Sequence, residues 1–182
     1  MKELLYVRYG LSSLQWVTRF VYTLFLGFCL ASYVIMFLMG SQRTGFGLEE
    51  IALYYAGNEE AFAAGEIDVE DYRPAKPREF LYDQTHFHLF SMPLLLFLQG
   101  HLFLLTTLPR RFKVAVVLAA FGGAACDLAA PWLIIDLSTD FAVVKAAGRL
   151  LLGPALLLFA AVPLYEMWIK PPRRARREKG PL

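Results

Sequence analysis

Four long apolar stretches, separated by short charged segments, dominate this sequence of 182 residues. They cover residues 20–39, 89–108, 114–135 and 141–168. A helix of about 20 residues crosses the hydrocarbon core of a bilayer, and each stretch is long enough to do so. The sequence therefore predicts an all-α, integral membrane four-helix bundle, with membrane-spanning segments at about 17–39, 85–108, 113–136 and 141–168.

The four segments and their connections account for nearly the whole chain. We therefore expect residues 1–182 to form a single membrane domain without a second folded unit. The connection at 40–83 contains two short patterns of helical spacing. One ends at Gly57, and the other starts at Asn58 and ends near Ala64. The sequence predicts two short amphipathic helices that lie on the outer membrane surface.

Charge is segregated along the chain. Loop 40–83 holds ten acidic and four basic residues, whereas the tail 170–182 holds six basic residues and one acidic residue. The turn at 109–113 is purely basic. Short cytoplasmic loops are enriched in Lys and Arg. We therefore expect a multi-pass protein of a bacterial-type inner (plasma) membrane, with both termini and the basic tail in the cytoplasm and the acidic loop 40–83 extracytoplasmic.

All three histidines, His86, His88 and His101, lie on the second apolar segment. Ionisable residues inside a membrane are candidates for function. In a helix, His86 and His88 point to different faces, whereas His86 and His101 share a face about 22 Å apart. Membrane b-type cytochromes place haem ligands at two such levels on one helix, and the similarity goes no further. The other segments have no histidine, so a haem here needs a methionine or another subunit's histidine as its second ligand.

Several alternatives remain open for these residues. His86, His88, His101 and Arg149 are the predicted cofactor-binding residues, for haem b or a quinone. His86, His88 and Asp83 are candidate ligands of a transition metal, since imidazole suits zinc and copper. The structural alternative is that His86 and His88 form hydrogen bonds with the outer loop.

Asp127 and Arg149 lie at similar depths in the third and fourth segments, which are antiparallel and joined by a tight turn. Because an unpaired charge in lipid is costly, we predict a buried ion pair between them. Alternatively, Arg149 holds an anion such as a haem propionate, or Asp127 relays protons to a quinone. Lys145 and Asp136 are nearer the end of the bundle and are expected to be solvated.

A second polar group is expected near the cytoplasmic side. Its members are Gln15, Arg19, Gln99 and His101. They predict either a hydrogen bond between helices or donors for a quinone head group.

The sequence contains no nucleotide-binding motif, no catalytic-triad spacing and no zinc-protease HExxH motif. We therefore expect a non-catalytic or electron-transfer subunit rather than a stand-alone enzyme. The leading hypothesis is a membrane subunit of a respiratory complex. The alternative is a structural anchor whose acidic outer helices dock an extracytoplasmic partner, and a small transporter is a third option. Expected partners are other membrane subunits and anionic lipids at the basic tail, with no nucleic acid.

Overall fold

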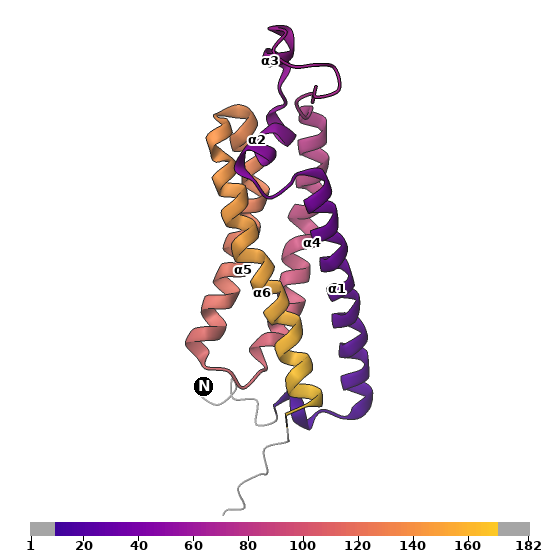
Figure 1. Ribbon diagram of the computed structural model, residues 1–182. Coiled ribbons are helices and arrows are strands. Elements are labelled where there is room, and N and C mark those ends of the chain that lie inside the picture. The colour runs from indigo at the N-terminus through magenta and orange to yellow at the C-terminus, as the bar shows by residue number, and fades with distance from the viewer. Residues whose placement is uncertain (1–9, 171–182) are drawn as a thin grey trace, which may run out of the picture.

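The computed structural model describes residues 10–170, and the basic tail beyond Lys170 lies outside this range. All regular elements in this range are helices (Figure 1), which confirms the predicted fold class. Four long helices form the bundle, and two short helices lie in the acidic loop. One 3₁₀ turn precedes the first long helix, and another joins the last two. In chain order the elements are η1 (Leu11–Ser13), α1 (Trp16–Arg43), α2 (Leu48–Ala56), α3 (Glu59–Ala63), α4 (Arg78–Leu104), α5 (Arg110–Asp136), η2 (Thr139–Phe141) and α6 (Ala142–Trp168).

The four long helices are each long and apolar enough to cross a membrane. Their ends define two ends of the bundle. The acidic end carries α2, α3 and the turn around η2, and the basic end carries the turn between α4 and α5 together with η1 (Figure 1). The first described residues and the last ones therefore meet at the basic end, where the Arg19 side chain donates to the carbonyl oxygen of Met167 at 2.9 Å.

Helices α5 and α6 form the closest pair in the bundle. Two glycines allow this approach: a Cβ atom on Gly123 would lie 2.7 Å from the Leu152 nitrogen, and one on Gly148 would lie 2.8 Å from the Asp127 nitrogen. Small residues at such contacts are typical of helix packing in lipid. The core around this hairpin includes the fully buried Phe103 and Phe159, which join α4 to α6.

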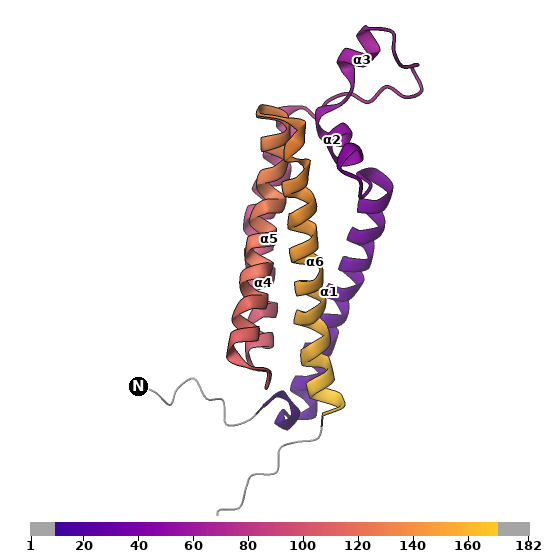
Figure 2. The ribbon, with the colours of Figure 1, turned by 60° about the vertical axis from the view of Figure 1, so that its left-hand side comes forward.

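Helix α1 is packed much more loosely than the others. Only 11% of its most apolar window is buried, against 44% for α6. Figure 2 shows α1 inclined away from α4 and α5. Side-chain hydrogen bonds join it to the other helices at several points. Trp168 Nε1, for example, donates to Thr23 Oγ1 at 2.9 Å, and Gln99 Nε2 donates to the Tyr33 hydroxyl. Most of the α1 surface is therefore left for lipid or for another protein.

Helix α2, predicted to lie on the outer membrane surface, packs its apolar side against α5 and α6. Ile51 and Tyr55, four residues apart, are buried there with Ile134 of α5 and Ala142 at the start of α6. The periodicity identifies an apolar stripe but does not say whether lipid or protein covers it. By contrast, α3 projects beyond the bundle (Figures 1 and 2).

The predicted boundary between the two short helices is confirmed, but the role of Asn58 is different. Gly57 ends α2 with a φ of 71°, a conformation that favours glycine. The Asn58 side chain does not cap α3. Its amide donates to the Asp71 carbonyl, and its oxygen accepts from the Arg73 backbone nitrogen at 2.7 Å. Asn58 thus joins the two sides of the projecting loop.

Helix α4 is shifted relative to its predicted span. It starts at Arg78, directly after the extended Pro77, and so begins seven residues before the predicted span of 85–108. It ends at Leu104, since the Thr106 hydroxyl donates to the Phe103 carbonyl and the Thr107 nitrogen is bound by Glu166. The last four residues of the predicted span, 105–108, therefore form a turn rather than helix.

Candidate functional site

The three histidines lie on two faces of α4, as their spacing predicts. His86 and His101 are exposed, on the same side of the helix as the exposed Phe90 and Phe97. His88 is half-buried, and its Nδ1 atom lies 2.8 Å from the Gln84 carbonyl oxygen. If Nδ1 carries the proton, this contact is a hydrogen bond and leaves Nε2 as an electron-pair donor.

The structure does not gather Asp83, His86 and His88 into a metal site. Among residues 10–170 there is no group of three or more His, Cys, Asp or Glu side chains placed to hold a metal ion. Asp83 and His86 are exposed, whereas His88 turns toward a different face. The three residues are close in sequence but do not converge in space.

A buried ion pair lies beneath α2, but its members differ from the prediction. Asp127 pairs with Lys145, whose Nζ lies 2.8 Å from Oδ1 and donates to the Asp127 carbonyl at 2.9 Å. Lys145, expected to be solvated, is only 3% exposed. The predicted Asp127–Arg149 pair is therefore wrong.

The rotation of α6 explains the change of partner. Gly148 faces α5 directly, so the next residue, Arg149, points about 100° away from α5. Its guanidinium donates to the Gly45 carbonyl at 2.8 Å and to Thr44 Oγ1 at 2.6 Å. Arg149 thus binds the carboxyl end of α1. A positive charge at this position interacts favourably with the negative end of the helix dipole. The depths of Asp127 and Arg149 along the bilayer normal could be estimated from the sequence, whereas the neighbouring helix that each side chain contacts could not.

Tyr55 of α2 lies over the ion pair. The Lys145 Nζ is 5.7 Å from the centroid of its ring. Burial raises the pKa of Tyr55 to about 12; nearby Asp127 also raises this pKa, while Arg149 and a hydrogen bond from Gln84 lower it. The Gln84 Oε1 atom is buried without a hydrogen-bond partner. These side chains form a polar cluster in the acidic half of the bundle, beneath α2. We call it the α2 cluster, and its residues are Tyr55, Gln84, Asp127, Lys145 and Arg149.

The polar group predicted near the basic end is not assembled. Gln15 and His101 are exposed, Gln99 contacts Tyr33, and Arg19 binds backbone carbonyls. Gln99 and His101 are two residues apart on α4 and therefore point to well-separated faces.

A different cluster occupies the basic end. The buried Glu166 carboxylate accepts hydrogen bonds from the Thr107 nitrogen at 3.0 Å and pairs with Lys170 at 2.9 Å. It fastens the turn between α4 and α5 to the end of α6. Sequence reasoning missed this contact, although a lone acid within the fourth apolar segment was its signal.

The four spanning helices define the chain as a multi-pass integral membrane protein. Residues 45–174 match the model of the Aq_1264_TM family, which is described as a transmembrane helical domain. The match covers well over half of the chain, so the protein belongs to this family. It includes α2 to α6 and begins directly after α1. No curated protein and no solved structure was found to match.

Proposed function

We propose that this chain is an electron-transfer subunit of a larger membrane assembly, oriented with both termini in the cytoplasm. In this proposal one face of α4, which we call the histidine face, lies against another subunit. Its residues are His86, Phe90, Phe97 and His101. The chain supplies a site within the membrane and does not act as an enzyme by itself.

The exposure of His86 and His101 carries this proposal. Both rings lie on the outside of the isolated bundle, and His86 is about 12 Å inside the start of α4. Polar side chains in membrane helices almost always face protein or water rather than lipid, because lipid offers no hydrogen-bond partner. A neighbouring subunit would bury the rings and the large phenylalanines between them.

Imidazole is an axial ligand of haem iron, and haem b is the cofactor we propose for this face. Helices α1, α5 and α6 have no histidine. The second axial ligand of a haem bound by His86 or His101 must therefore be a methionine or a histidine of the neighbouring subunit. Arg149 no longer supports a propionate contact, because its donors are used at the end of α1. His88 points elsewhere and is not part of the proposed site.

Absorption spectra of the native assembly, oxidised and dithionite-reduced, test this function. We expect a Soret shift and the α-band of haem b. His86→Ala should remove most of the haem bound at His86, and His101→Ala most of the haem bound at His101, while the assembly stays intact. His88→Gln serves as the matched control and should keep the full haem content. An assembly without haem bands, or full haem content in both alanine variants, contradicts the electron-transfer function.

A second function, a structural anchor, is favoured by the projecting part of the acidic loop. Exposed acidic side chains surround α3 beyond the end of the bundle: Glu59, Glu60, Glu66, Asp68, Glu70 and Asp71. They would dock a basic extracytoplasmic partner. Replacing these acids by amides should release that partner in a salt-dependent pull-down. If the amide variant retains every partner in the pull-down, the proposed anchor function is contradicted.

A further inference from the structure

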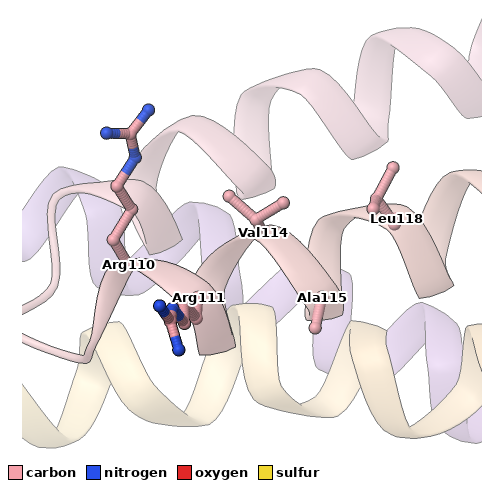
Figure 3. A pocket seen from close by; sticks show the side chains of 5 residues that line it. All are labelled: Arg110, Arg111, Val114, Ala115 and Leu118. Atoms are coloured by element: carbon pink, nitrogen blue, oxygen red, sulfur yellow. The ribbon is translucent and has the colours of Figure 1, made fainter.

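A shallow groove runs along α5 at the basic end of the bundle. Its volume is about 470 Å³, and it is lined by the five residues labelled in Figure 3: Arg110, Arg111, Val114, Ala115 and Leu118. It is separate from both the histidine face and the α2 cluster. All of its lining comes from the first nine residues of one helix.

The mouth of the groove is positively charged. Arg110 and Arg111 are exposed, and the first turn of α5 has no acidic residue. Within residues 10–170, neither arginine forms an ion pair. The nearby Lys113 is engaged differently, since its Nζ donates to the Leu104 and Thr106 carbonyls. The two guanidinium groups therefore remain as donors for an anion, and arginine binds phosphate oxygens in a bidentate manner.

The rest of the groove is apolar. Figure 3 shows Arg110, Val114 and Leu118 in one row along α5, with Arg111 and Ala115 in the row beside it. Leu118 lies about 12 Å along the helix axis from Arg110. The methyl group of Ala115 leaves a hollow between larger side chains. A charged mouth at the end of a spanning helix and an apolar channel running into the bilayer match the two parts of a phospholipid.

We propose that this groove binds one phospholipid with an anionic head group, whose phosphate meets Arg110 and Arg111 and whose acyl chain lies over Ala115. Charge complementarity selects an anionic lipid over a zwitterionic one, because two cations face the head group and no carboxylate of residues 10–170 pairs with them. Basic sites between membrane helices bind anionic head groups in the same way. The apolar channel distinguishes this ligand from free phosphate, which would leave Val114, Ala115 and Leu118 uncovered.

Native mass spectrometry of the full chain in detergent, with added phosphatidylglycerol or phosphatidylcholine, tests the proposal. The wild type should retain phosphatidylglycerol in preference. Two variants should each weaken this binding about tenfold: Arg110→Gln with Arg111→Gln, which removes the charge, and Ala115→Leu, which fills the hollow. Two matched controls should bind as the wild type does: Arg43→Gln, at the opposite end of the bundle, and Ala125→Leu, at another exposed position of α5.

Three results would overturn the groove as a lipid site. The first is equal retention of the two lipids. The second is unchanged binding by Ala115→Leu, which would show that the arginines attract the lipid only through general surface charge and not through a shaped groove. The third is displacement of the lipid by inorganic phosphate alone at equal concentration, which would show that the apolar channel plays no part. The test substitutions replace exposed side chains, so each variant should unfold at the wild-type temperature in lipid-free detergent.

Discussion

The Asp127–Lys145 pair places two charges in the acidic half of the bundle, about 13 Å inside the end of α5. Each charge would be costly alone, since lipid and packed helices solvate ions poorly. We expect Asp127→Asn or Lys145→Met to lower the free energy of unfolding by about 3–5 kcal/mol, and the double variant to lose less than the sum. Detergent-denaturant titrations measure this double-mutant cycle.

Arg149 provides the control for that cycle. It binds the end of α1 rather than Asp127, so the effects of Arg149→Gln and Asp127→Asn should be nearly additive. Strong coupling between 127 and 149, with additivity between 127 and 145, would contradict the observed pairing.

Tyr55 should report whether α2 stays docked on the bundle. Burial raises the pKa of its phenol to about 12, above the value of about 10 for tyrosine in an unfolded chain. The folded state holds this proton more tightly, so its stabilising effect is complete below about pH 10 and is lost as the pH rises toward 12. The phenolate absorbance of the wild type minus that of Tyr55→Phe isolates this group. A transition close to pH 10 would mean that α2 leaves Tyr55 open to water.

At the scale of the elements, the α5–α6 contact depends on a small number of glycines. Ala at Gly123 would place its Cβ 2.7 Å from the Leu152 nitrogen and 2.9 Å from the Gly148 carbonyl oxygen, so the helices would have to separate. We expect Gly123→Ala to destabilise the protein by about 1–3 kcal/mol, as overpacking does in other cores. Thermal unfolding in detergent measures the loss.

The neighbouring glycine is the matched control. A Cβ on Gly122 meets nothing within 4 Å, so Gly122→Ala should be neutral or stabilise α5 by about 0.5–1 kcal/mol. An equal gain in stability at both positions would show that helix propensity, and not interhelical contact, governs the effect.

Much of the arrangement of elements could be predicted from the sequence, because the length of an apolar run fixes whether a helix can span a bilayer. The end of α2 at Gly57 followed from local chemistry in the same way. The relative faces of residues on one helix also followed from their spacing, but the neighbouring helix that each face meets could not be predicted. The partner of Asp127 depends on how closely Gly148 lets α6 approach α5, and α2 is buried because Ile51 and Tyr55 find protein instead of lipid.

On the scale of the whole molecule, the chain divides into a compact part and a loosely attached helix. The family match covers α2 to α6, the part in which the short α2 is docked onto the α5–α6 hairpin. Helix α1 precedes that match and is held chiefly by contacts with α6 and by the Arg149 contacts at its end. The histidine face on α4 belongs to the matched part.

Membership of a larger assembly is tested most directly by photo-crosslinking in native membranes. A photoreactive amino acid replaces Phe90 on the histidine face or Phe28 on α1, two side chains of nearly equal exposure, 77% and 76%. We predict that position 90 gives a protein adduct of one defined mass and that position 28 gives lipid adducts. Lipid adducts alone at position 90 would contradict the proposed contact between α4 and another subunit.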